Sequence, residues 1–382
     1  MKKILLIGLT TLICFAGFIS CDDWTETEAK VFETGDGKSD EYYANLRQWK
    51  AETQHDMAFG WYGFWSGSGV NLKNTMKGLP DSLHMVSVWG PWLPSTLTDA
   101  KKADLKYVQE VKGTKVLACS FAAYVGNGIT SNTPENLAAW GWTWEHTGAT
   151  GDNTSCTHCV ATDPAERELQ LESIRKYARA MADSTIAGGY DGLDIDFEPS
   201  WSKGGAISNH FINMEEFIKE LGKYLGPKSA NPHLILAIDG ECEYLTRETG
   251  PYVDYFIKQN YWGNEGANET QLNSRLKSVI DALVSSELSA KDIAKKYLTT
   301  VNFESYAANG GFNSTTSFTK PDGSKTNQLQ GHAEWQPVYD GVTLQKGGYG
   351  SFHIEAEYTV SGMSGFYPWT RAAMKAVHPP HQ

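Results

Sequence analysis

Short apolar runs recur along the chain, and most are followed by polar loop residues and then by an amphipathic segment. Eight of these runs have the length and composition of β-strands, namely residues 57–65, 82–90, 114–124, 189–199, 233–241, 255–262, 297–305 and 364–369. A helical hydrophobic period with acidic first turns is clearest over residues 99–113, 163–189, 213–227 and 269–287. Strands that alternate with helices predict a parallel sheet, and eight such units predict a closed TIM (β/α)8 barrel.

An open, doubly wound sheet is the competing fold, but no GxGxxG motif follows the first predicted strand. The least regular unit is the seventh, because residues 306–348 are rich in Gly, Asn, Ser and Thr and predict a long loop. Loops of this length are often functional. We therefore predict an α/β protein in which residues 51–382 form one TIM barrel with long βα loops.

The N-terminus has the layout of a secretory signal peptide. Lys2 and Lys3 precede an apolar run, and Asp22 and Asp23 follow closely after it. The run is short for a membrane span, so we expect residues 1–20 to be absent from the mature protein.

The end of this segment, FISC up to Cys21, resembles a bacterial lipobox, in which the cysteine is lipidated and becomes the new N-terminus. The acidic stretch DDWTE that follows resembles the signal that sends lipoproteins to the cell surface in the Bacteroidetes. These resemblances imply a lipid anchor on Cys21, a tether over residues 21–50, and a place on the exposed side of the bacterial outer membrane.

Charge and aromatic content narrow the range of partners. The chain has 33 Lys and Arg against 45 Asp and Glu, a formal net charge of −12, so its field repels a phosphate backbone and we expect no nucleic-acid partner. Aromatic residues make up 12 % of the chain, more than a core usually requires. Flat apolar rings are what ligand clefts and sugar faces use, so this excess is consistent with a ligand cleft of either kind.

Four cysteines remain once Cys14 and Cys21 are set aside, and two of them lie in the stretch CTHC. Cys156 and Cys159 could close a small disulfide loop in an oxidising compartment, remain thiols, or contribute with His158 to a metal site. No second CxxC or HxxxH completes the four ligands that zinc requires. We predict no metal and no cofactor.

The stretch DGLDIDFEP is the most informative in the chain. Side chains alternate along a strand, so Asp194, Asp196 and Glu198 point one way while Leu193 and Ile195 point the other. If the apolar set packs against helices, the acidic set faces the barrel interior, where like charges cannot all ionise cheaply. An exposed edge strand with a solvated acidic face is the structural alternative. Clustered carboxyls whose pKa values are pushed apart are a catalytic arrangement.

Together with Asp191, these three acids match the DxxDxDxE signature of glycoside hydrolase family 18, and the chain resembles the chitinases and endo-β-N-acetylglucosaminidases of that family over about residues 50–380. The resemblance implies that Glu198 is the general acid/base. It also implies that Asp196 orients the substrate's own 2-acetamido group, whose oxygen attacks the anomeric carbon, so no protein nucleophile is needed. Asp194 would share a proton with Asp196. Asp191 is counted among the substrate-binding residues, although its main role would be to support the geometry of the strand.

The sixth predicted strand ends in QNYW, where Gln259 and Tyr261 face the same side and both can hydrogen-bond an amide oxygen. Chitinases of the family commonly carry MxYD at this place, whereas endo-β-N-acetylglucosaminidases often carry QxY. By this resemblance Tyr261 holds the acetamido carbonyl and Gln259 contacts the same sugar. A tyrosine that caps the core is the structural alternative.

Eleven of the thirteen tryptophans fall near predicted strand ends or in the loops that follow them. Trp369 ends the eighth predicted strand, where the family usually places the floor of the sugar site, although a core role is the alternative. Trp262 follows Tyr261, and Trp142 and Trp144 lie in the long third loop, where we expect a sugar platform.

Taken together, these features predict an endo-β-N-acetylglucosaminidase that cleaves between the two core GlcNAc residues of N-linked glycans and acts as a monomer. The long polar loops 125–160 and 306–348 suit a branched, soluble glycan better than chitin. Two alternatives remain open. One is a chitinase of the same family, and the other is a surface glycan-binding protein on an inactivated barrel, although such proteins usually lose the acid that Glu198 supplies.

Overall fold

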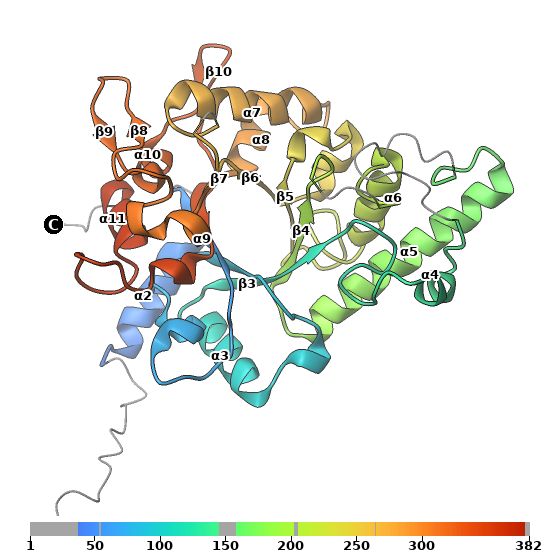
Figure 1. Ribbon diagram of the computed structural model, residues 1–382, viewed down its shortest axis with the longest axis horizontal. Coiled ribbons are helices and arrows are strands. Elements are labelled where there is room, and N and C mark those ends of the chain that lie inside the picture. The colour runs from blue at the N-terminus through green and yellow to red at the C-terminus, as the bar shows by residue number, and fades with distance from the viewer. Residues whose placement is uncertain (1–36, 53–54, 145–157, 202–204, 264, 379–382) are drawn as a thin grey trace, which may run out of the picture. The chain divides into compact units, whose positions relative to one another are not determined.

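The computed structural model describes residues 37–52, 55–144, 158–201, 205–263 and 265–378 (Figure 1). The chain divides into two compact units, Met1–Tyr43 and Ala44–Gln382, and all the barrel strands belong to the second. No helix of the described part is long and apolar enough to cross a membrane. The expected signal peptide and Cys21 lie outside the described residues.

Eight parallel strands close into a barrel in the order β1-β12-β7-β6-β5-β4-β3-β2, which confirms the predicted TIM barrel (Figure 1). The strands are β1 (Met57–Tyr62), β2 (Met85–Val88), β3 (Lys115–Phe121), β4 (Gly192–Phe197), β5 (Ile235–Gly240), β6 (Tyr255–Gln259), β7 (Tyr297–Asn302) and β12 (Gly348–Phe352). Seven of them lie inside the runs predicted from the apolar pattern. We call the C-terminal ends of these strands the mouth, because TIM-barrel active sites form there.

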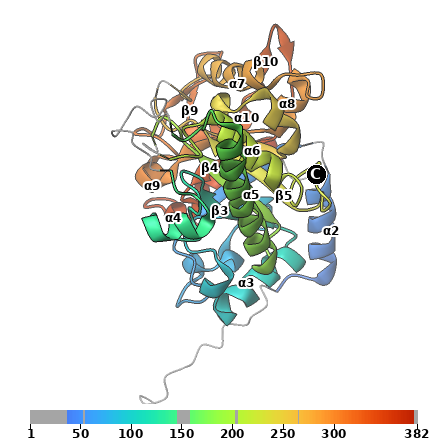
Figure 2. The same cartoon turned by 90° about the vertical axis from the view of Figure 1, so that its right-hand side faces the viewer.

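All four predicted helices form. The α-helices of the described residues are α2 (Asp40–Ala51), α3 (Asp99–Glu110), α4 (Pro134–Trp140), α5 (Pro164–Ala187), α6 (Phe211–Leu221), α7 (Glu269–Leu283), α8 (Ala290–Lys296), α9 (Phe303–Tyr306), α10 (Gln328–Glu334) and α11 (Pro368–Val377). The side chain of Asp163 caps α5 by accepting from two backbone amides, and that of Asn268 caps α7 by accepting from the Gln271 amide. Helices α5 and α6 lie side by side (Figure 2), joined by an ion pair between Arg179 and Glu220 at 3.0 Å.

The eighth strand was predicted at the wrong place. Residues 364–369 contain no strand, and the barrel closes with β12, which lies just after the segment read as a long loop. The apolar pattern did not reveal this strand, because two of the five residues in its sequence, GYGSF, are glycines. A Cβ on Gly348 would come within 2.3 Å of the Met57 carbonyl oxygen, and one on Gly350 within 2.4 Å of that of Phe59, so these glycines permit close pairing with β1.

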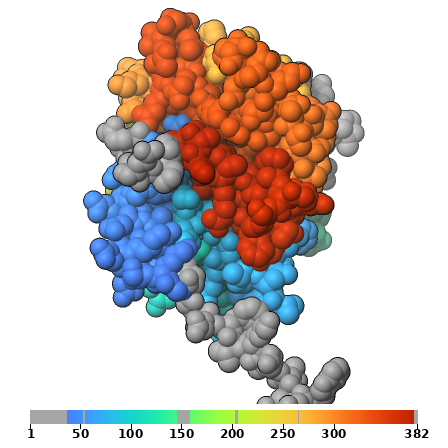
Figure 3. Space-filling view, turned by 90° about the vertical axis from the view of Figure 1, so that its left-hand side faces the viewer, coloured from blue at the N-terminus to red at the C-terminus, as the bar shows by residue number. Residues whose placement is uncertain are grey.

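The segment between β7 and β12 is structured rather than loop-like. It contains α9, α10 and two small hairpins, β8 (Phe318–Thr319) with β9 (Lys325–Thr326) and β10 (Val338–Tyr339) with β11 (Val342–Thr343). Helix α10 packs against α11, and Figure 3 shows the orange and red segments before and after β12 forming one continuous surface. The stretch expected as a tether includes α2, whose Arg47 donates to the Val111 carbonyl at 2.7 Å.

The apolar residues form two layers. One cluster lies between the strands and the surrounding helices, and it includes Leu193, Ile195 and Phe197 of β4. A smaller cluster fills the barrel interior, with Phe59, Trp61, Met85, Leu117, Cys119, Ala237, Ile257 and Leu298. The interior cluster forms the base on which the polar residues of the mouth rest.

Candidate active site

Strand β4 divides its side chains as the alternation predicts. Leu193, Ile195 and Phe197 are fully buried in the outer layer, whereas Asp194 and Asp196 point into the barrel interior. The two carboxyls are 0 % and 3 % exposed, which excludes an edge strand with a solvated acidic face. Burying carboxyl groups side by side is unfavourable, so their surroundings determine which of them hold protons.

Asp194 is held by donors from two other strands. Trp61 Nε1 and Ser87 Oγ both donate to its Oδ2, at 2.9 and 2.7 Å. Burial raises the pKa of Asp194 to about 6, and the hydrogen bond from Ser87 opposes that shift. Asp194 therefore has one oxygen fully occupied and is the least costly of the buried acids to ionise.

A further acid, Asp239, joins these two from β5. It lies directly opposite Asp196 in the strand register and is fully buried. Its carboxyl hydrogen-bonds with those of Asp194 and Asp196, and its Oδ1 accepts from Gln259 Nε2 at 2.9 Å. We call Asp194, Asp196 and Asp239 the carboxyl triad. Burial, together with the mutual repulsion of these groups, raises the pKa values of Asp196 and Asp239 well above the usual range.

Glu198 follows the last residue of β4 and is half-buried at the mouth. Burial raises the pKa of its carboxyl, although a hydrogen bond with Gln259 acts in the opposite direction. Gly240 leaves room for it, because a Cβ there would lie 3.1 Å from Glu198 Cγ and 2.5 Å from the Phe197 carbonyl oxygen. The positive φ of 96° at Gly240 also suits glycine. Glu198 is thus a carboxyl that retains its proton to higher pH than a solvated one.

Tyr261 comes just after β6, and its hydroxyl is buried. Within the described residues this hydroxyl makes no hydrogen bond of normal geometry, although Thr300 lies close by. Burial and the charges of Asp239, Asp196 and Glu198 raise its pKa well above the usual range, so the phenol is protonated. A buried donor without a partner costs stability, and such groups often mark a site that a ligand completes.

Aromatic rings surround these polar groups. Phe352, the last residue of β12, lies nearly parallel to the Tyr261 ring with centroids 6.0 Å apart. Its ring also meets that of Trp89 edge-on, with centroids 5.2 Å apart, and the ring centroids of Trp89 and Phe121 are 5.6 Å apart. A cavity of about 380 Å³ opens between the ends of β2 and β3, and Trp89, Phe121 and Asn127 are among the residues that line it. The mouth therefore offers ring faces and amide groups together, as sugar sites do.

Some of the residues predicted to bind substrate lie elsewhere. Asp191 precedes β4 at the opposite end of the barrel, where it pairs with Lys115 at 3.0 Å and accepts from the Val116 amide at 2.9 Å. It supports the strand, as expected, but its predicted contact with substrate is wrong. Trp369 lies on α11, not on a strand, and donates to the Ala307 carbonyl at 2.7 Å. Phe352 occupies the strand end that had been assigned to Trp369.

Trp142 and Trp144 of the third loop do not form the exposed sugar platform that the sequence predicted. Trp142 is only 2 % exposed and donates to the Trp144 carbonyl at 2.9 Å, so its ring offers no free face. Trp144 is half-buried and bonds to Glu166. Trp262, in contrast, is 49 % exposed beside Tyr261 and remains available at the mouth.

Sequence reasoning missed Asp239 and Phe352. Asp239 lay in a predicted strand at an inward-facing position, and the alternation rule applied to residues 233–241 could have found it. Phe352 had no comparable signal, because its strand was read as a loop.

Among the described residues, one group of side chains could in principle hold a metal ion. Ligand atoms of Cys119, Asp194 and Asp239 lie within 4.8 Å of one another, but burial and the nearby acids raise the pKa of the Cys119 thiol well above its usual range, which disfavours a thiolate ligand. Elsewhere, Cys159 is buried and disulfide-bonded. Cys156 lies outside the described residues.

A closed parallel barrel with a half-buried carboxyl, a set of buried acids and aromatic rings at its mouth is an arrangement that suits the cleavage of glycosides. The chain belongs to glycoside hydrolase family 18. The model of that family described as "Glycoside hydrolase family 18, BT1044-like" matches residues 19–376. This confirms the resemblance drawn from the DxxDxDxE signature.

Solved structures agree with the fold. BT1044, solved as a glutamate-to-glutamine variant with selenomethionine, is 28 % identical, with a TM-score of 0.70 over 89 % of this chain and 93 % of its own. The endo-β-N-acetylglucosaminidase from Cordyceps militaris is 21 % identical, with a TM-score of 0.58 over 90 % of this chain and 97 % of its own. A variant of that fungal enzyme bound to fucosyl-N-acetylglucosamine-Asn has a TM-score of 0.54 at 19 % identity, with the same coverage of both chains. A comparison with curated proteins found no match.

Proposed function

We propose that this chain is an endo-β-N-acetylglucosaminidase that hydrolyses the GlcNAc-β1,4-GlcNAc core bond of N-linked glycans by substrate-assisted, retaining catalysis. The observation that carries the proposal is the buried Tyr261 hydroxyl, which makes no hydrogen bond of normal geometry with the described residues and lies close to the charges of Asp196 and Glu198. A protonated phenol at this place can donate to the carbonyl oxygen of a 2-acetamido group. Membership of family 18 supplies the reaction class.

Glu198 acts first as the acid. Its raised pKa keeps a larger fraction of the carboxyl protonated near neutral pH, so it can give its proton to the glycosidic oxygen. The bond between C1 and that oxygen breaks while the acetamido oxygen of the same sugar attacks C1. Glu198, now a carboxylate, then takes a proton from water, which attacks C1 and restores the acetamido group. Two displacements at C1 retain the β configuration.

Asp196 and Tyr261 stabilise the cyclic intermediate. Its positive charge favours a carboxylate at Asp196, and the acetamido N–H can donate to that carboxylate. Tyr261 fixes the carbonyl oxygen at the attacking angle. Because these groups are buried in the barrel interior, their interaction with developing charge is stronger than it would be in water.

The choice of N-glycans over chitin rests on the residues near Tyr261. Gln259 stands where chitinases of the family commonly carry methionine, and it contacts both Asp239 and Glu198. Trp262 is exposed at the mouth beside it. The small hairpins between β7 and β12 add surface that suits a branched glycan.

Mass spectrometry of released glycans tests the proposal. We expect the wild-type protein to free glycans from a mixed N-glycoprotein panel, leaving one GlcNAc on the protein, and to release little from chitin oligomers. Glu198→Gln should lower kcat by about 10²- to 10⁴-fold, the usual range for a general acid/base. Glu52→Gln, which changes an exposed carboxyl at the opposite end of the barrel, is the matched control and should match the wild type.

Three outcomes would contradict the proposal. Chitobiose release without glycan release would favour a chitinase. Glycan binding without turnover would favour the glycan-binding alternative. Unchanged turnover in Glu198→Gln would remove Glu198 from the reaction.

We propose further that the protein is a monomer anchored to the outer membrane by a lipid on Cys21. Cells that express it should incorporate labelled palmitate into the wild type, and Cys21→Ser should lose both the label and the membrane fraction. Equal labelling of the two would contradict the anchor. Surface exposure would appear as cleavage by protease added to intact cells.

A further inference from the structure

Asp239 occupies a position that the reaction described above does not use. It is fully buried on β5, directly opposite Asp196 in the strand register. Its Oδ1 accepts from Gln259, and the Cys119 sulfur lies 4.0 Å from its Oδ2. It therefore touches the buried acids on β4 and, through Gln259, the catalytic Glu198.

The hydrogen-bond donors are unevenly shared within the triad. Asp194 Oδ2 receives two, from Trp61 and Ser87. The Oδ1 atoms of Asp194 and Asp196 are buried and receive none from the N–H and O–H groups of the described residues. Both side chains nevertheless hydrogen-bond with Asp239, and a hydrogen bond between two carboxyls requires a proton on one of them.

The charged and titratable groups around Asp239 favour such a proton. They are Asp194, Asp196 and Glu198 from β4 and its end, Glu241 after β5, Cys119 on β3, and Tyr261 and Lys258 from β6 and its end. Lys258 is the one cation among them, and its ammonium pairs with Glu243 at 2.7 Å and donates to the Gly240 carbonyl at 3.0 Å. Three adjacent carboxyls without a bonded cation cannot all ionise.

We propose that Asp239 is a positioning residue that holds a proton between Asp194 and Asp196 and uses it to donate a hydrogen bond to Asp196. This inference rests on the proposed function, because Asp196 is the group that must face the acetamido N–H. Asp239 does not touch the substrate. Its hydrogen bond to one oxygen of Asp196 holds that carboxyl in a single orientation. The second oxygen of Asp196 then faces the substrate.

The proposal makes an unusual prediction about amide substitution. An asparagine at this position keeps a donor toward the triad and an acceptor for Gln259, so it mimics the protonated acid. Asp239→Asn should therefore retain kcat within about 10-fold of the wild type, whereas Asp239→Ala should lose about 10- to 100-fold, the usual effect of deleting a hydrogen bond to a charged group. Asp191→Asn, the same change at the far end of β4, should leave kcat unchanged.

A second readout needs no substrate. A buried acid that stays protonated in the folded protein reduces stability as pH rises above its unfolded pKa of about 3.9, because the unfolded chain then releases the proton more readily. The asparagine variant lacks this group. Its melting temperature should therefore rise relative to that of the wild type between pH 4 and pH 8.

Two results would overturn the inference. One is an asparagine variant as inactive as the alanine variant, which would mean that a carboxylate is required. The other is a melting-temperature difference that does not change with pH. If the wild type hydrolyses no glycan, the proposed function fails, and the melting experiment still decides whether Asp239 holds the proton.

Discussion

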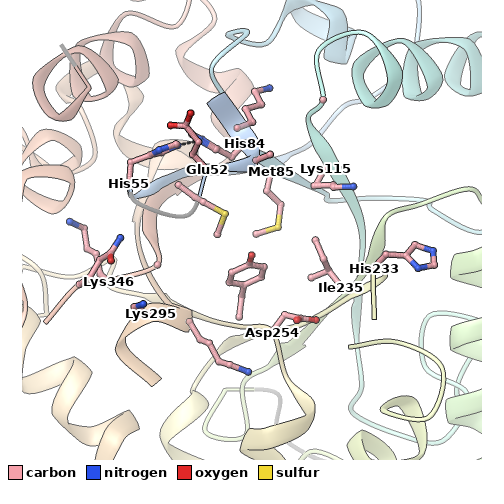
Figure 4. A pocket seen from close by; sticks show the side chains of 18 of the residues that line it. Glu52, His55, His84, Met85, Lys115, His233, Ile235, Asp254, Lys295 and Lys346 are labelled. Carbon is pink, nitrogen blue, oxygen red and sulfur yellow. Dashed lines mark hydrogen bonds between the residues drawn. The ribbon is translucent and has the colours of Figure 1, made fainter. Parts of the chain in front are cut away.

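The two ends of the barrel differ in how their polar groups are satisfied. At the N-terminal end, a cavity of about 610 Å³ is lined by basic and aromatic side chains, among them His55, His84, Lys346 and Tyr255 (Figure 4). This cavity is larger than the one at the mouth, yet its buried polar groups are paired. Lys346 pairs with Asp56 and donates to the Ala333 and Trp335 carbonyls.

His55 and His84 at the N-terminal end are also hydrogen-bonded. His84 Nδ1 accepts from the Ala58 amide at 3.2 Å, so its proton lies on Nε2, which faces His55 Nε2 at 2.8 Å (Figure 4). His55 must then accept, and both rings are neutral. Trp49 stacks on His55 with centroids 4.6 Å apart.

The mouth is built differently. Its buried acids repel one another, and the Tyr261 hydroxyl makes no hydrogen bond of normal geometry with the residues that the structure describes. Unsatisfied groups of this kind cost stability and are retained where a ligand uses them. The comparison teaches that the size of a cavity does not locate the chemistry of this barrel, whereas the clustering of several buried carboxyls beside the Tyr261 hydroxyl does.

The largest effect on stability is expected at the N-terminal end. Lys346→Met would remove a fully buried ammonium and leave Asp56 without its partner. Breaking a buried ion pair in this way costs about 3–5 kcal/mol, measurable by denaturant unfolding. Activity per folded molecule should stay at the wild-type level. A variant that folds normally but has lost activity would contradict the division between the two ends.

Tyrosines on one face of β6 and its end provide a matched pair for activity. Tyr261→Phe removes the unpaired hydroxyl, so we expect kcat to fall about 10- to 100-fold, the effect of losing a hydrogen bond to a developing charge. The melting temperature should stay constant or rise, because no hydrogen bond of normal geometry is lost. Tyr255→Phe, at the N-terminal cavity, should keep kcat unchanged. Equal losses in the two variants would show that the hydroxyl at the mouth has no special role.

The smallest effect concerns pH. Burial, with Lys50, His55 and His378 nearby, lowers the pKa of His84 to about 2. The unfolded chain binds this proton below about pH 6.5 while the folded protein does not, so His84 lowers stability as pH falls from 6.5. His84→Gln should therefore show a shallower loss of melting temperature between pH 6.5 and pH 4.5. His233→Gln, an exposed histidine at the same cavity, should behave as the wild type. Identical slopes for His84→Gln and the wild type would contradict this reading.

The alternation of apolar and polar residues predicted most of the fold. Seven strands and four helices follow from it, because their buried faces repeat at strand or helix period. Strand β12 does not follow, since its glycines serve close backbone pairing with β1, a contact that only the closed barrel creates. Because β12 was not predicted, the end of the eighth strand was assigned to Trp369 and not to Phe352.

The site was predictable in part for a similar reason. Asp194, Asp196 and Glu198 lie on one strand, so their common direction can be read from spacing alone. Asp239 comes from a different strand, and its place opposite Asp196 depends on the register between β4 and β5. The burial of Trp142 depends on how its loop packs, which local sequence does not encode.

The anomeric configuration of the first product tests the central claim most directly. Proton NMR of the reaction during the first minutes, with an N-linked glycan as substrate, reports the configuration at C1 of the newly formed reducing end. Assisted attack by the acetamido group predicts that the β anomer appears first and that a substrate with a free amine in place of that group is not cleaved. Initial formation of the α anomer, or equal cleavage of the amine substrate, would contradict the account.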